Sequence, residues 1–210
     1  TGPEDRKRIF LNLTQLGATI LVPVFVGIAL ISQDFINVFV ASEFRAVGPI
    51  LGLLASFGSL APFYNFRNAV LIALKRTRAL VNLALWDIVF LSALCLVLRP
   101  FGTMGLVSAL GLVYLVSTVL FMPIVLKEVG VKLGALVYRV APAYLGAAVM
   151  AATVLISSSM FADMPSLWQI GLKSSIGAAT YFAYLFLIHR NWLQKTVEMV
   201  LDRKAQVKPA

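Results

Sequence analysis

The sequence predicts an all-α membrane protein, a polytopic bundle of six transmembrane helices. Of its 210 residues, 60% are hydrophobic and only 13% are charged, whereas a soluble domain carries about a quarter charged residues. The apolar residues gather in six long runs bounded by charged residues. Each run is far longer than the roughly 10 alternating residues of a transmembrane β-strand. The composition therefore lacks the charge to cover a soluble globule, and the run length favours helices.

The six runs have roughly the length that a helix needs to cross a hydrocarbon core of about 30 Å. We expect membrane spans at residues 10–32, 47–74, 80–98, 102–126, 139–160 and 167–189. We interpret the chain as a piece of a longer protein, in which residues 1–9 form a cytoplasmic linker and residues 190–210 a basic cytoplasmic tail. The segment after Trp192 either forms a short amphipathic helix on the membrane surface or is a frayed end.

The positive charges predict the orientation of the spans. Of the 18 lysine and arginine residues, only Arg45 and Arg99 lie at one set of span ends. The residues at the opposite ends are Arg6, Lys7, Arg8, Lys75, Arg76, Arg78, Lys127, Lys132, Arg139, Arg190, Lys195, Arg203, Lys204 and Lys208. Because cytoplasmic ends carry the excess of such residues, both termini are predicted to be cytoplasmic, in a cell (inner) membrane whose anionic lipids attract the same charges. No basic soluble face is present, so nucleic acid is not an expected partner.

Three ionisable residues fall inside predicted spans, where each charge costs about 2.5–3.5 kcal/mol on insertion scales. Arg67 lies eight residues before Lys75, and Asp87 lies nine residues after Arg78. At 1.5 Å per residue, both are about 12–14 Å from the turn that they share, so they are level and can pair. Such a pair is either an architectural tie or part of a water-filled cavity in which Arg67 attracts an anionic group, and the two roles are compatible. Lys173, the third, is expected to extend its long side chain towards the outer surface.

The second and first predicted spans carry uncharged polar residues. Asn65 and Asn68 follow directly after Pro62, and a proline bend of this kind either lines a substrate site or is an ordinary packed kink. In the first span, Asn12 and Gln15 lie on one helical face. That face contacts either another helix or an aqueous cavity, and we favour the cavity because the polar residues continue along the helix to Thr19.

Residues that carry covalent or metal chemistry are scarce. The sequence has one cysteine and one histidine, Cys95 inside an apolar run and His189 at a predicted membrane edge. Neither has a second metal-ligating residue or a base at the required spacing. No glycine-rich phosphate-binding loop is present. We therefore expect neither an enzyme nor a bound metal or cofactor.

Several hydrophobic segments follow one another in an order typical of one transporter family. They are Val-Gly-Ile-Ala-Leu-Ile-Ser at 26–32, Phe-Ile-Asn-Val-Phe-Val-Ala-Ser-Glu-Phe at 35–44, residues 46–54, Asn-Ala-Val-Leu-Ile-Ala-Leu-Lys-Arg at 68–76 and Gly-Thr-Met-Gly-Leu-Val-Ser-Ala at 102–109. On these segments, residues 11–130 resemble the C-terminal part of polysaccharide flippases, the lipopolysaccharide and exopolysaccharide transporters of the MOP (multidrug/oligosaccharidyl-lipid/polysaccharide) exporter superfamily.

The resemblance implies a protein of two lobes, each with about six spans, around a central cavity that opens alternately to the two sides of the membrane. This chain would be the second lobe, and its partners would be the missing N-terminal lobe, a lipid-linked oligosaccharide and polysaccharide polymerase machinery. In such a cavity Arg67, chosen for its position in the span, would bind phosphate, while Asn65, Asn68, Asn12 and Gln15 would bind sugar hydroxyls or freed backbone groups. The alternatives are a drug or cation exporter of the same superfamily, with Asp87 as its coupling carboxylate, and a non-transporting scaffold of an envelope-glycan complex.

Overall fold

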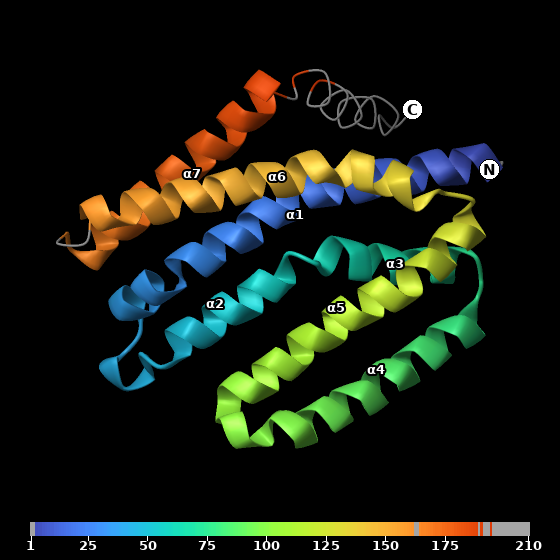
Figure 1. Cartoon of the computed structure of the whole chain (residues 1–210), viewed down its shortest axis with the longest axis horizontal. Coiled ribbons are helices and arrows are strands. Elements are labelled where there is room, and N and C mark those ends of the chain that lie inside the picture. The colour runs from blue at the N-terminus through green and yellow to red at the C-terminus, as the bar shows by residue number, and fades with distance from the viewer. Residues whose placement is uncertain (1–2, 162–163, 189, 191–193, 195–210) are drawn as a thin grey trace, which may run out of the picture.

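The computed structural model describes residues 3–161, 164–188, 190 and 194, and these residues form helices and turns with no strand among them (Figure 1). The α-helices are α1 (Pro3–Phe39), α2 (Val47–Gly58), α3 (Ala61–Ala73), α4 (Thr77–Leu98), α5 (Gly102–Val129), α6 (Leu133–Ser158) and α7 (Ser166–Ile188). The short 3-10 helices are η1 (Ser42–Phe44), η2 (Arg99–Phe101) and η3 (Ser159–Phe161). The all-α class predicted from the composition is confirmed for this part of the chain.

Within the described residues, four helical stretches are long and apolar enough to cross a membrane. They are Glu4–Phe39, Thr77–Val129, Leu133–Phe161 and Ser166–Leu187, and a fifth is added if α2 and α3 together count as one bent span. The stretch Thr77–Val129 contains both α4 and α5, which lie antiparallel as a hairpin in Figure 1. The turn between α4 and α5 ends at Gly102, whose φ of +62° is readily adopted only by glycine.

The ends of several helices differ from the predicted spans. Residues 3–9, the segment expected as a linker, are helical and belong to α1, and Glu4 and Asp5 in the first turn stabilise that helix start. At its other end α1 continues to Phe39, seven residues beyond the expected end of the first span. Helix α6 begins at Leu133, six residues before the expected start of the fifth span. The expected tail at 190–210 lies outside the described residues except for Arg190 and Gln194.

The second predicted span is a bent pair of helices. Helix α2 ends at Gly58 and α3 begins at Ala61, with an angle of 48° between them. Pro62 lies in the first turn of α3, where its missing N–H costs no helical hydrogen bond and its ring disfavours continuation of a preceding helix. The bend predicted at Pro62 is therefore present, and it gives α3 an axis different from that of α2.

The helices pack around α1 and α5. Helix α1 contacts α2, α6 and α7, whereas α5 contacts α4, α2 and α3. Two glycines allow close contact between neighbouring helices, because Phe57 on α2 packs over Gly111 on α5 and Phe66 on α3 packs over Gly17 on α1. The buried residues between α1, α5 and α6 form the main core: Phe10, Leu11, Ala18, Val22, Met122, Leu126, Val131, Leu136, Val140, Ala143 and Ala147.

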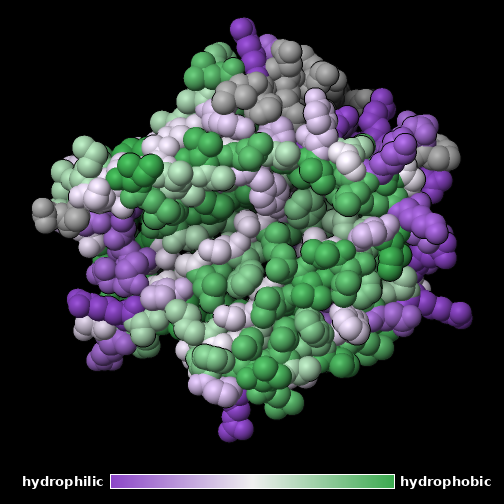
Figure 2. Space-filling model, in the orientation of Figure 1, coloured by the Kyte–Doolittle hydropathy of each residue, from purple (hydrophilic) through white to green (hydrophobic). Residues whose placement is uncertain are grey.

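The outer surface of the bundle is apolar. Figure 2 shows hydrophobic residues across the middle of the visible face and hydrophilic residues gathered at its left and right sides, where the helices of Figure 1 end and turn. Large side chains such as Leu96 on α4, Ile156 on α6 and Leu187 on α7 are 75–78% exposed. An exposed apolar band between two polar ends matches the layers of a bilayer. The surface is consistent with a membrane protein.

Candidate functional site

Arg67 and Asp87 form an ion pair inside the bundle. Arg67 comes from α3 and Asp87 from α4, and Nη2 of the arginine lies 3.3 Å from Oδ2 of the carboxylate. The arginine side chain is 1% exposed and the aspartate side chain 12%. The two helices are joined by the short turn at Leu74–Arg76, which holds both residues at the same depth. Because Arg67 and Asp87 lie at nearly equal distances along their helices from this turn, their side chains can meet.

A third helix completes the polar cluster. Ser117 on α5 donates its hydroxyl proton to Oδ1 of Asp87, and its backbone carbonyl accepts a hydrogen bond from Nη1 of Arg67 at 3.4 Å. Tyr64 donates its phenolic proton to Oδ2 of Asp87 at 3.0 Å, and the guanidinium carbon lies 4.4 Å from the centroid of the Tyr64 ring. Nε of Arg67 donates to Oδ1 of Asn68 at 3.3 Å. We call Arg67, Asp87, Tyr64, Ser117 and Asn68 the Arg67 cluster.

The Arg67 cluster compensates the cost of burying two charges. A buried ion pair gains stability only when further hydrogen bonds satisfy both groups, and here each carboxylate oxygen and each of the three guanidinium nitrogens has a partner. Removing one member alone leaves the other as an uncompensated charge, at a cost of about 3–5 kcal/mol. The cluster thus fastens α3, α4 and α5 to one another.

Asn12 and Gln15 lie elsewhere and contact a different arginine. Nη1 of Arg139, on α6, donates to Oδ1 of Asn12 at 3.2 Å and to Oε1 of Gln15 at 2.9 Å. Gln15 is 1% exposed. Asn12 and Gln15 therefore pack against α6 and bind its arginine, whereas Thr19, further along the same face, lines a cavity of about 460 Å³. Arg139 is itself inside a helix, since α6 starts six residues earlier.

The residues expected to form one substrate site are thus divided among separate places. Arg67 and Asn68 share the Arg67 cluster, Asn12 and Gln15 bind Arg139, and Asn65 is exposed on α3. Two cavities, of about 590 Å³ and about 460 Å³, are present in the described bundle, and none of these five residues lines either of them. Arg67 lines neither of these two cavities, because Tyr64, Phe121 and Ser117 enclose its guanidinium.

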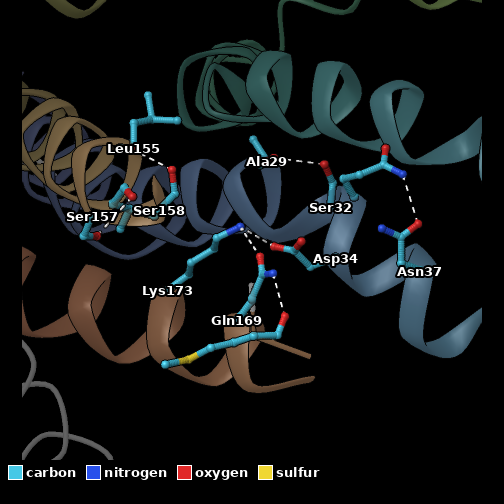
Figure 3. Close-up of polar contacts among 12 residues, drawn as sticks. Ala29, Ser32, Asp34, Asn37, Leu155, Ser157, Ser158, Gln169 and Lys173 are labelled. Atoms are coloured by element: carbon cyan, nitrogen blue, oxygen red, sulfur yellow. Dashed lines mark hydrogen bonds and ion pairs between the residues drawn. The ribbon is translucent and has the colours of Figure 1, made fainter. Parts of the chain in front are cut away.

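Lys173 is paired with a carboxylate on another helix. Figure 3 shows its amine pointing from α7 towards Asp34 on α1, with Nζ 2.6 Å from Oδ2 of the carboxylate. A second acceptor, Oε1 of Gln169, lies 3.3 Å away. The two charged side chains are 12% and 13% exposed. Asp34 is not among the residues predicted from the sequence, because the first span is expected to end at residue 32.

Two tyrosines also satisfy backbone groups inside the bundle. Tyr144 on α6 donates to the carbonyl of Ser59 at 2.8 Å, and Ser59 lies in the break between α2 and α3. Tyr181 on α7 donates to the carbonyl of Thr19 on α1 at 2.8 Å. Carbonyl groups at a helix break within lipid need such a partner, since water is absent there. The proline at the break indicates from the sequence that a backbone carbonyl group lacks its helical partner. It does not indicate which side chain binds that carbonyl.

The described residues contain no group of three or more histidine, cysteine, aspartate or glutamate side chains that could hold a metal ion. Comparison with known proteins adds no assignment: the chain matches no family model, no curated protein and no solved structure.

Proposed function

We propose that this chain is the C-terminal lobe of a polysaccharide flippase of the MOP exporter superfamily, which moves a lipid-linked oligosaccharide across the cytoplasmic membrane for surface or exopolysaccharide export. The observation that carries the proposal is the position of Arg67, an arginine 1% exposed inside an apolar helix bundle. Ionisable residues within membrane spans are rare, and they mark substrate paths by default. The resemblance of residues 11–130 supplies the class of substrate.

The proposal includes six membrane crossings. α1, α4, α5, α6 and α7 each provide one crossing, and the bent pair of α2 and α3 provides the remaining one. An even number of crossings puts both ends of the lobe on the same side of the membrane, and the excess of lysine and arginine at that set of ends assigns this side to the cytoplasm. A preceding lobe of similar design is the partner that would close a central cavity.

In this mechanism the lobes rock about the substrate and no covalent bond changes. Asp87 keeps the Arg67 side chain compensated while no substrate is present. A substrate pyrophosphate, which carries two negative charges where a carboxylate carries one, takes over the arginine in the open state through paired hydrogen bonds from the guanidinium. Helix α3 carries Arg67 on an axis separate from α2, so it can move without unfolding its neighbour. The lipid tail stays in the bilayer, and the protein lowers the cost of moving sugar and phosphate through hydrocarbon.

Glycan export by the cell that makes this protein tests the proposal. We expect Arg67→Ala to abolish export of the glycan while the variant remains in the membrane, and Arg67→Lys to retain only part of the export because an ammonium lacks the paired donors of a guanidinium. Arg45→Ala is the control. It removes an exposed arginine at the span ends predicted to face away from the cytoplasm, and this variant should export the glycan normally. Normal export by the Arg67→Ala variant would remove Arg67 from the site.

A second candidate is a non-transporting scaffold in an envelope-glycan assembly, and the burial of the polar residues favours it. Arg67 and Gln15 are both 1% exposed, which is the tight packing that a scaffold needs. A cysteine placed at Asn68 in the full protein, which leaves Arg67 intact, distinguishes the two functions. A transporter exposes this cysteine to a water-soluble thiol reagent during turnover, whereas a scaffold protects it at all times.

A further inference from the structure

The cavity of about 590 Å³ opens at the end of the bundle that carries the N-terminus, between α1, α3 and α5. On α1 its lining runs from Arg6 to Leu13, and on α3 from Phe66 to Leu74. Seven residues of helix cover about 10 Å, so the cavity spans about that depth along α1. If the predicted spans are placed in a bilayer, the rim of the cavity lies at the headgroup layer on the predicted cytoplasmic side, and its floor lies in the hydrocarbon.

The rim of this cavity is positively charged. Arg6 and Lys127 both line it, and the residues described by the structure provide neither of them with an ion-pair partner. Glu128 also lines the cavity, but its carboxylate is 3.1 Å from Nη2 of Arg76, which lies outside the lining. The negative charge of the rim is therefore already balanced, and two cations remain to attract an anion.

The end of α5 places Lys127 at this rim. Gly130 adopts a left-handed conformation with φ +74°, and the N–H of Val131 donates to the carbonyl of Leu126 at 2.8 Å. This is the usual glycine cap at a helix C-terminus, and it turns the chain away after the last turn of α5. Lys127 stays in that last turn, and its side chain is exposed.

Below the rim the wall is apolar. Phe10 is 4% exposed and belongs to the main core, and Phe66 packs against the same core from α3. Leu13, Val70 and Ala73 complete the wall. A cationic rim above an apolar wall about 10 Å deep has the polarity profile of an anionic lipid, whose phosphate lies at the headgroup layer and whose chains enter the hydrocarbon.

We propose that this cavity holds one anionic phospholipid of the adjacent leaflet, with its phosphate between Arg6 and Lys127 and an acyl chain along Phe10 and Phe66. The site is separate from the Arg67 cluster, so the proposal stands independently of the transport function. A zwitterionic lipid fits the wall equally well but gains less from the two cations. The occupant is therefore chosen by its headgroup charge.

Native mass spectrometry of the full purified chain tests the site, with dioleoyl phosphatidylglycerol and dioleoyl phosphatidylcholine as probes that share their acyl chains. We expect one phosphatidylglycerol to be retained, with an affinity about tenfold or more above that of phosphatidylcholine. The double variant Arg6→Gln/Lys127→Gln should lose this preference. The matched variant Arg78→Gln/Lys132→Gln removes one arginine and one lysine at the same end of the bundle but outside the cavity, and it should keep the preference.

A third variant tests the wall without changing a charge. Ala69 lines the cavity on α3, and Ala69→Trp fills it, so we expect retention of phosphatidylglycerol to fall while both cations remain. Equal losses in the two double variants would show general surface attraction and overturn the proposal. Full retention by the Ala69→Trp variant would overturn it as well, as would complete displacement of the lipid by millimolar inorganic phosphate, because the acyl chain would then have no role.

Discussion

Asp34 and Lys173 are separated by 139 residues in the sequence and lie 2.6 Å apart in the structure, where they join α1 to α7. Each charged side chain is almost completely buried. Arg139 joins α1 to α6 through Gln15 in a similar way, about 28 Å further towards the N-terminus of the same helix by the helical rise. Helix α1 is therefore fastened by polar contacts at two points well separated along its length.

The first prediction concerns the Asp34–Lys173 pair. Lys173→Met leaves a buried carboxylate without its cation, so we expect a loss of about 1–3 kcal/mol in the free energy of unfolding. The double variant Asp34→Leu/Lys173→Met removes both charges and should recover most of that loss. Unfolding of the purified chain in detergent measures both values. If the double variant is as unstable as Lys173→Met, the stability that Lys173 provides does not come from its ion pair with Asp34.

The second prediction concerns Arg139. Arg139→Ala leaves the side-chain oxygens of Asn12 and Gln15 without this donor, and we expect a loss of about 1–3 kcal/mol. Arg45→Ala, which removes an exposed arginine outside any described ion pair, should change stability by less than about 0.5 kcal/mol. The same unfolding measurement applies. Similar effects of the two substitutions would contradict the assigned role of Arg139.

The third prediction concerns the break between α2 and α3. Tyr144→Phe removes the hydroxyl that binds the Ser59 carbonyl but keeps the ring, which stacks on Phe63 at a centroid distance of 5.8 Å. We expect a loss of about 0.5–1.5 kcal/mol and faster amide exchange at Ser59 and Leu60. Tyr138→Phe is the control, because Tyr138 is 80% exposed. Unchanged exchange at the break in the Tyr144→Phe variant would refute the prediction.

The fourth prediction concerns helix contact. A methyl group on Gly111 would overlap the ring of Phe57, so Gly111→Ala should destabilise the chain by about 1–3 kcal/mol. At Gly134, in the first turn of α6, a methyl group meets no atom within 4 Å. Gly134→Ala should therefore be neutral or slightly stabilising. The comparison of the two alanine variants in one unfolding assay tests whether α2 and α5 pack as closely as described.

The sequence could predict pairs that a short turn holds in register. Arg67 and Asp87 flank one turn between two antiparallel helices, so counting residues at a constant rise places them level. The bend at Pro62 was likewise predictable, because proline acts on its own helix. The class of all-α membrane protein follows from composition and the length of the apolar runs.

Contacts between distant helices could not be predicted in this way. The polar face of Asn12 and Gln15 is visible in the sequence, but the helix that covers it is set by the packing of the whole bundle. Asp34 and Lys173 lie on helices with no short turn between them, so counting residues does not fix their relative depth. Because hydropathy falls at residue 32, the sequence predicts that Asp34 lies outside the first span. The helix itself continues to Phe39 and includes Asp34.

The most direct test of the proposed role of Arg67 separates substrate binding from the architecture of the Arg67 cluster. The variant Arg67→Leu/Asp87→Leu removes both charges, so it should fold without a stranded charge. The measurement is movement of a lipid-linked oligosaccharide across reconstituted vesicles that contain the complete protein. We predict wild-type protein levels and stability with no movement of the substrate. Movement at the wild-type rate by this double variant would contradict the account, because Arg67 would then be only a structural tie.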